Sequence, residues 1–365
     1  MAALEYQETD SGVINWGVSL TPRTSPFKKE PAAASGKIIR GVLNFGADSS
    51  NSIPFLWQCQ AGKLYLDLNR NQDLTDDPSG LFLARAAKPD NYQTFANVHL
   101  LFNTASGRCR VLADLSFWDY SAPPICSFAV RSFWQGKLRL QGRDWQVGIV
   151  PNILDRSGLF ENSRLLLRPW DKRSQPFNAD DGLLATVPFS RKLFVDGHAY
   201  QLECVARSQD GEARPALQFT EQSVALGEVK ITGQFIRRLV LQGEAFLVVL
   251  DQPAGVVKIP AGSYHQPEIL LEQDGVAAFS RNSGQWQIGR QISVRDKAQV
   301  ALNAGGPLTN SVATGRHGQD LRLDYCLLGV GGETYQLARQ DRSKPPEFAV
   351  YKGGKKIASG RFEFG

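Results

Sequence analysis

The sequence from residue 63 to residue 77 reads Lys63-Leu64-Tyr65-Leu66-Asp67-Leu68-Asn69-Arg70-Asn71-Gln72-Asp73-Leu74-Thr75-Asp76-Asp77. Its first four residues, Lys63–Leu66, have the composition of a β-strand and not of a helix. The residues that follow carry an oxygen-bearing side chain at every second position: Asp67, Asn69, Asn71 and Asp73. In a tight loop this spacing turns alternate side chains toward one point. The stretch therefore predicts a strand that leads into a loop of converging oxygen atoms.

Such a loop suits a hard cation, since Ca²⁺ takes about six to eight oxygen ligands. The register resembles the first, third and fifth positions of an EF-hand loop, and Leu74 and Thr75 fit the eighth and ninth. Gln72 departs from that pattern where glycine usually makes the turn, and Pro78 departs where a bidentate Glu belongs. The predicted calcium ligands are Asp67, Asn69, Asn71, Asp73, Asp76 and Asp77. The alternative is a surface turn without metal, because Asn and Asp favour turns by themselves.

Strand patterns continue on both sides of this loop. Short runs rich in Val, Leu, Ile, Phe and Tyr alternate with clusters of Gly, Asn, Asp and Pro, and no window shows a capped helical period. The runs expected as strands in the first part of the chain are Lys63–Leu68, Val98–Asn103, Arg108–Leu115, Ser127–Phe133, Lys137–Leu140 and Trp145–Val150. The pattern predicts an all-β protein made of several β-sandwich (Ig-like) modules in tandem.

We expect three domains along the 365 residues. Residues 1–215 form a β domain that carries the Asp/Asn-rich loop, residues 216–303 an Ig-like or transthyretin-like sandwich, and residues 304–365 a C-terminal Ig-like module. Two hairpins are predicted from their turns: Asp196-Gly197 inside Lys192–Leu202, and Gly353-Gly354 between Phe348–Tyr351 and Ile357–Phe362.

Three phrases in these modules resemble a group of uncharacterised exported β-rich bacterial proteins. The phrases are Leu64–Asn69, Val257–Tyr264, and the closing Gly331–Tyr335, Lys344–Pro346 and Ser359–Gly365. The resemblance implies a place outside the cytoplasm and no established activity, so it assigns no catalytic residue. The positions it carries over are the loop oxygens at Asp67, Asn69, Asn71 and Asp73.

Composition restricts the compartment and the partners. The net charge of +5 is small for this length, and the basic residues are scattered, which excludes a nucleic-acid-binding stripe. We find no apolar run long enough to span a membrane and no signal peptide at the N-terminus. The expected location is periplasmic or extracellular with the signal removed, or cytoplasmic if the N-terminus is native. The five cysteines form no C-x-x-C pair. One disulfide among Cys59, Cys109 and Cys126 is possible after export.

The sequence lacks a nucleophile elbow, a Walker A loop and a Rossmann fingerprint, and its four histidines share no metal-ligand spacing. The expected function is therefore non-enzymatic binding or scaffolding, with a cell-envelope protein or a polysaccharide as partner and a structural calcium ion. One alternative is carbohydrate binding through exposed aromatic residues, for which Trp118, Tyr120 and Trp170 are the candidates. Another is a glycoside-hydrolase-like enzyme that uses acidic residues such as Asp180-Asp181 or Asp76-Asp77.

Overall fold

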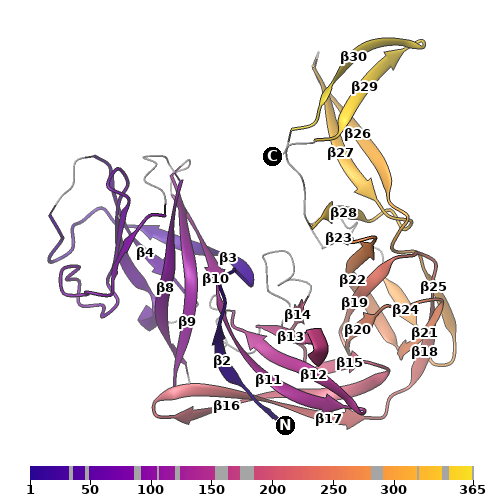
Figure 1. Cartoon of the computed structure of the whole chain (residues 1–365), viewed down its shortest axis with the longest axis horizontal. Coiled ribbons are helices and arrows are strands. Elements are labelled where there is room, and N and C mark those ends of the chain that lie inside the picture. Colours follow the sequence, from indigo (N-terminus) through magenta and orange to yellow (C-terminus); the bar gives the residue numbers. More distant parts are fainter. Residues whose placement is uncertain are drawn as a thin grey trace. The chain divides into compact units, whose positions relative to one another are not determined.

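The computed structural model describes residues 1–32, 36–45, 49–85, 92–104, 107–119, 124–152, 163–172, 185–280, 291–318, 320–338 and 345–363 (Figure 1). Strands dominate these residues, and two short 3-10 turns lie at Ser49–Asn51 and Trp170–Lys172. The prediction of an all-β protein is confirmed. No helix among the described residues has the length and hydropathy needed to cross a membrane. The chain forms two compact units, which are described separately: Met1–Phe189 with Leu202–Phe219, and Ser190–Gln201 with Thr220–Gly365.

The first unit contains an antiparallel sheet that closes on itself. Its strands are β3 (Ile14–Pro22), β4 (Ile38–Asn44), β5 (Ile53–Gln58), β6 (Lys63–Leu66), β7 (Leu81–Leu83), β8 (Tyr92–Thr104), β9 (Gly107–Trp118) and β10 (Ile125–Val130). Neighbours in sequence pair along the series, with β7 and β8 joined at Ala84↔Phe95. Pairing of β10 with the first half of β3 closes the sheet.

Alternate residues of these strands fill the interior with large apolar side chains. Aromatic rings meet there across strands, with Phe55, Trp57 and Phe95 all packed against Phe117. One polar side chain joins them: Gln93 accepts a bond from Trp57 Nε1 at 2.7 Å and donates to Cys59 O at 2.6 Å. The side chains that form this core include Leu43, Phe45, Ile53, Leu64, Leu66, Leu100, Phe102, Val111, Leu115 and Phe128.

A second antiparallel sheet of the first unit has the order β14-β13-β12-β11-β2. Its strands are β2 (Glu5–Glu8), β11 (Ser132–Leu140), β12 (Arg143–Val150), β13 (Arg164–Pro169) and β14 (Thr186–Pro188). The expectation of one strand over Ser127–Phe133 is wrong, because the chain leaves the closed sheet at Arg131 and starts the second sheet at Ser132. Lys137–Leu140 is the end of this same strand β11.

The remaining strands of the first unit extend the closed sheet. β1 (Ala2–Ala3) pairs with β17 (Glu212–Gln222), which meets β9 at Glu212↔Arg108. A turn at Asp210-Gly211, both with positive φ, joins β17 to β16 (His198–Gln209). Both strands continue from one unit into the other.

The second unit places one apolar core between two groups of strands. One group is β15 (Lys192–Val195), β20 (Leu247–Asp251), β19 (Ile236–Gly243), β22 (Gly262–Gln273), β23 (Val276–Ser280) and β24 (Ile292–Val294). The other is the three-stranded sheet β21 (Val256–Pro260), β18 (Leu226–Ile231) and β25 (Gln299–Leu302). Leu239, Leu241 and Val248 of the first group share a buried cluster with Val229 and Ile259 of the second.

Hairpins complete the second unit. β26 (Thr309–His317) pairs with β27 (Asp320–Leu328), which pairs with β28 (Thr334–Leu337), and β29 (Glu347–Lys352) pairs with β30 (Lys355–Arg361). The predicted hairpins at Asp196-Gly197 and Gly353-Gly354 are confirmed, and all four turn residues have positive φ. The expected domain limits at 215/216 and 303/304 stay predictions.

Candidate functional site

The candidate site is the loop between β6 and β7. Asp67 follows β6 directly and is fully buried, with its N–H bonded to Pro54 O at 2.9 Å. Leu66 N donates to Gly80 O at 2.8 Å, so the two ends of the loop lie together at its base. The loop therefore leaves and re-enters the closed sheet at one point.

Side-chain oxygens in this loop accept a spiral of backbone N–H groups. Asp67 Oδ1 accepts from Asn71 N at 3.1 Å, and Asp67 Oδ2 accepts from Gln72 N at 2.9 Å. Asn69 Oδ1 also accepts from Asn71 N, at 3.0 Å, and Asn71 Oδ1 accepts from Asp73 N at 2.6 Å. The alternation of Asp and Asn along the sequence thus becomes a set of nested turns closed by these oxygens, in which Asp67 is buried and Asn69 and Asn71 are exposed to solvent.

Two residues of the spiral have left-handed backbone, Arg70 with φ of 61° and Gln72 with φ of 68°. Gln72 holds the turn that glycine usually makes, at a cost of about 1–2 kcal/mol for a residue with a Cβ. Contacts from an earlier segment hold it there. Arg23 Nη2 donates to Gln72 Oε1 at 3.3 Å, and Lys29 N donates to Gln72 O at 3.3 Å.

The acidic residues that end the loop turn back on its start. Asp76 accepts from the side-chain amides of Asn69 at 3.0 Å and Asn71 at 2.6 Å, and Asp77 Oδ2 accepts from Leu68 N at 2.9 Å. Burial raises the pKa of Asp77 above its ordinary value, and the charges of Asp67 and Asp76 raise this pKa further. Carboxylates from both ends of the loop therefore repel one another at close range.

Asp73, another predicted ligand, has protein partners of its own. Its carboxylate accepts from the N–H of Thr75 at 3.0 Å and from the Thr75 hydroxyl, and it forms an ion pair with Lys29 Nζ at 2.9 Å. The Thr75 hydroxyl and the Lys29 ammonium lower the pKa of Asp73 to about 2. Lys29 thus supplies Asp73 with the positive charge that the sequence analysis assigned to a metal.

The segment that carries Lys29 also packs on the loop. Leu74, buried in the loop, lies in an apolar cluster with Phe27 and Leu56, and Leu74 N donates to Lys29 O at 3.1 Å. Lys28 Nζ donates to Asn71 O at 3.4 Å. These contacts, between residues far apart in the sequence, fix the loop from one side.

The arrangement offers oxygen ligands from Asp67, Asn69, Asn71 and Asp76. Each Asn oxygen accepts one bond in the spiral and retains a second lone pair. In the part of the chain that the structure describes, no three side chains of the His, Cys, Asp or Glu type gather as metal ligands. A cation in this loop would therefore depend on the amide oxygens of Asn69 and Asn71, which are ligands suited to Ca²⁺.

The aromatic candidates lie in different parts of the first unit. Trp118, at the end of β9, is partly exposed and meets Tyr92 of β8 with ring centroids 5.1 Å apart. Trp170 is partly exposed in a short 3-10 turn, with Lys137 Nζ 5.1 Å from its ring centre. Tyr120 lies outside the described residues. Sequence reasoning missed Tyr92, because only the register of β8 and β9 places it opposite Trp118.

The remaining candidates have other environments. Asp180-Asp181 lies outside the described residues, and Asp76 and Asp77 are held within the loop. Cys59, Cys109 and Cys126 are buried and belong to no disulfide. Burial raises the pKa of the Cys59 thiol to about 11, so this thiol stays protonated at neutral pH.

Comparison of the chain with protein-family models, with curated proteins and with solved structures finds no match.

Proposed function

We propose that the protein is a non-enzymatic, extracytoplasmic binding or scaffolding protein whose Asp67–Asp77 loop takes up Ca²⁺ as a structural ion. The observation that carries the proposal is the spiral of N–H groups bonded to the side chains of Asp67, Asn69 and Asn71. The side chains at the first, third and fifth positions of the loop all accept backbone N–H groups of the loop, which supports a common site for an ion.

The ion would act on the charges within the loop. Asp67 and Asp76 accept hydrogen bonds within the loop, and the pKa of Asp77 is raised by its burial and by the charges of both carboxylates. A divalent cation bound by Asp67, Asn69, Asn71 and Asp76 would replace this repulsion with attraction and tie the end of β6 to the start of β7. Asp73 takes no part through its carboxylate, which Lys29 and Thr75 hold.

The weak binding expected of such a site supports the proposed location outside the cytoplasm. Amide ligands and the absence of a bidentate Glu make a weak loop, and extracellular calcium modules bind with dissociation constants of about 10⁻⁴ to 10⁻³ M. That range suits a protein outside the cytoplasm, as the resemblance to exported β-rich proteins implies. Its partner would be a polysaccharide or a protein of the cell envelope.

Asp76→Asn in the full-length chain tests the calcium proposal. Asp76 is exposed and its described bonds are to Asn69 and Asn71, so the variant should fold as the wild type does in chelator. At ten times its dissociation constant Ca²⁺ should stabilise the wild type by about 1.4 kcal/mol. Asp76→Asn should lose most of this gain because it removes a charged ligand. The measurement is thermal unfolding with Ca²⁺ and with chelator.

Asp324→Asn is the matched control, because Asp324 is an exposed carboxylate of β27 that pairs with Arg322 and should leave the calcium response unchanged. Asp67 is unsuitable for the test, since it accepts two backbone N–H groups and its loss would destabilise the loop in chelator too. An equal melting temperature of the wild type with Ca²⁺ and with chelator would refute the calcium loop.

A further inference from the structure

We infer that the outer face of β8, β9 and β10 binds a neutral polysaccharide chain. The inference rests on the binding role proposed above and names the ligand class. The residues of this hydroxyl–aromatic face are Tyr92, Thr94, Ser116, Trp118, Ile125 and Ser127.

Register alone places these six residues in two rows across the three strands. Tyr92 lies opposite Trp118, and Trp118 lies opposite Ile125. One step further along, Thr94 lies opposite Ser116, and Ser116 lies opposite Ser127. Their sequence neighbours Gln93, Phe117 and Cys126 are buried, so the alternation of the strands sends the six side chains to the outside.

The first row is aromatic and apolar and lies open to solvent. Tyr92 is 43% exposed and Ile125 53% exposed, which are large values for such side chains within a sheet. The rings of Tyr92 and Trp118 are inclined by 39° at a centroid distance of 5.1 Å. Aromatic rings with one open face provide the surface on which the apolar C–H face of a sugar ring packs.

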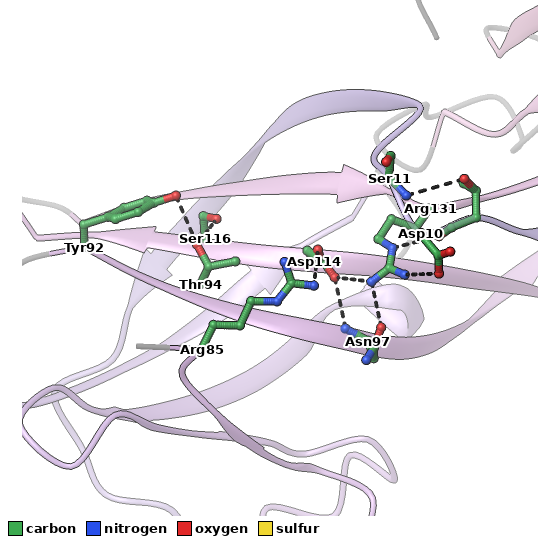
Figure 2. Close-up of polar contacts among 10 residues, drawn as sticks. Asp10, Ser11, Arg85, Tyr92, Thr94, Asn97, Asp114, Ser116 and Arg131 are labelled. Carbon is green, nitrogen blue, oxygen red and sulfur yellow. Dashed lines mark hydrogen bonds and ion pairs between the residues drawn. The ribbon is translucent and has the colours of Figure 1, made fainter. Parts of the chain in front are cut away.

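The second row consists of small hydroxyl side chains. Thr94 Oγ1 lies 2.8 Å from Ser116 Oγ and donates to Tyr92 Oη at 3.0 Å, so the hydroxyls form a connected chain (Figure 2). The row continues on β3 at Gly17, which lies opposite Ser127 and has open space where a Cβ would be. Hydroxyls act as both donors and acceptors, which matches the hydroxyls of a sugar. Across three strands the row spans about 10 Å, the length of a disaccharide.

A charged cluster limits the face on the side away from the aromatic row. Asp114 Oδ1 accepts from Arg131 Nη1 and from Asn97 N, both at 3.0 Å, and Arg85 Nη2 lies 3.2 Å from Asp114 Oδ2 (Figure 2). The segment at Gly12 lies over Ala129, because a Cβ on Gly12 would come within 3.3 Å of the Ala129 Cβ. The face therefore ends at this cluster.

The charge of the face selects among polymers. Its six residues carry no charge, and the nearest described ionic groups are paired: Asp114 with arginines, and Asp119 with Lys37. Among the described residues of this face, an acidic polymer finds no cation without a partner, and a basic polymer finds no such carboxylate. Neutral sugar chains match both the aromatic row and the hydroxyl row.

Calorimetry with the full-length protein tests the inference, using cellohexaose, maltohexaose and laminarihexaose as neutral probes and polygalacturonate as the acidic probe. At least one neutral oligosaccharide should bind and polygalacturonate should not. Trp118→Ala should weaken the binding by about tenfold or more, because it removes half of the aromatic pair. Ser116→Arg should weaken the binding by a similar factor, because the larger side chain fills the hydroxyl row. This substitution removes no atom of the core.

Leu101→Ala is the matched control, since Leu101 is an exposed apolar side chain on the same strand as Tyr92 and lies outside the face. It should bind as the wild type does. The inference fails if none of the neutral probes binds, if only polygalacturonate binds, or if Trp118→Ala and Ser116→Arg bind as tightly as Leu101→Ala. None of these results would change the effect of Ca²⁺ on the melting temperature. The two proposals are therefore tested separately.

Discussion

Gln72 adopts a left-handed backbone conformation that is unfavourable for a residue with a Cβ. Its φ of 68° is the conformation that glycine adopts without strain, and the bonds from Arg23 and Lys29 hold it in place. A residue with a Cβ at this position therefore raises the free-energy cost of the turn.

Gln72→Gly and Gln72→Ala form a matched pair that measures this cost. Both remove the amide that bonds to Arg23, but only alanine keeps a Cβ in the left-handed backbone. Gln72→Gly should be more stable than Gln72→Ala by about 1 kcal/mol. Urea unfolding of the two variants in chelator measures the difference. Equal stabilities would mean that the loop does not hold this backbone conformation in solution.

At the same scale, the sequence predicts part of the candidate site and omits part of it. The spacing of Asp67, Asn69 and Asn71 predicted side-chain oxygens that serve one loop, and each of them accepts a backbone N–H of that loop. Their use as ligands of an ion stays a prediction. The sequence could not predict the ion pair of Asp73 with Lys29, because Lys29 lies in a segment more than forty residues earlier in the chain. Tyr92 was missed for a similar reason: its place beside Trp118 depends on the pairing of β8 with β9.

Among the elements, the segment that precedes β4 depends on an ion pair. Arg40 of β4 donates to both oxygens of Glu30, at 2.8 and 2.7 Å, and Glu30 Oε1 also accepts from Phe27 N at 2.8 Å. Phe27 packs on Leu74, so this pair helps to position the segment that covers the Asp67–Asp77 loop. The bonds from Arg40 lower the pKa of Glu30 below its ordinary value of 4.5.

Glu30→Gln should therefore change how stability depends on pH. A lowered pKa in the folded state means that the ionised carboxylate stabilises the fold above the unfolded pKa. This contribution is lost as the pH falls below about 4.5 toward the folded pKa. The variant should be less stable than the wild type by about 1 kcal/mol at pH 7, and the gap should narrow in acid. Denaturant unfolding across this range measures it.

Glu347→Gln is the comparison for this prediction, because the Glu347–Arg361 pair is exposed on both sides, at 69% and 68%, and should contribute no measurable stability. If the difference in unfolding free energy between Glu30→Gln and the wild type stayed constant from pH 7 into acid, the role assigned to the carboxylate would be contradicted.

Strand limits illustrate what local patterns can predict. The turns at Asp196-Gly197 and Gly353-Gly354 are correct because two residues with positive φ are enough to specify a tight hairpin. The division at Arg131 was missed because Ser127–Phe133 has a strand-like composition throughout. Arg131 is buried and donates to Thr9 O, Asn97 and Asp114, which come from three other segments. The pairing of β3 with β10 is equally non-local.

For the whole molecule, the two compact units alternate along the sequence. Residues 190–201 belong to the second unit, although they precede residues 202–219 of the first. The second unit also contains residues 304–365 and most of the expected module 216–303, of which residues 216–219 lie in the first unit. Local signals could not show this, because β15 finds its parallel partner β20 about fifty residues later.

Each unit nevertheless has an apolar core built from its own residues. The buried cluster around Leu239 contains residues of the second unit, whereas the Asp67–Asp77 loop closes on strands of the first. Calcium and a core substitution in the second unit should therefore act on different strands. Ca²⁺ should slow amide hydrogen exchange in residues 63–83, because it ties the end of β6 to the start of β7.

Leu239→Ala supplies the opposite perturbation. It removes a fully buried side chain and should cost about 2–5 kcal/mol, with faster exchange in β19, β20 and β22. Hydrogen exchange read by peptide mass should show the calcium effect at residues 63–83 unchanged in Leu239→Ala. If Ca²⁺ also slowed exchange in β19 and β22, or if the substitution abolished the response of the loop, the two units would share one cooperative transition. The calcium loop would then stabilise the entire chain and not the first unit alone.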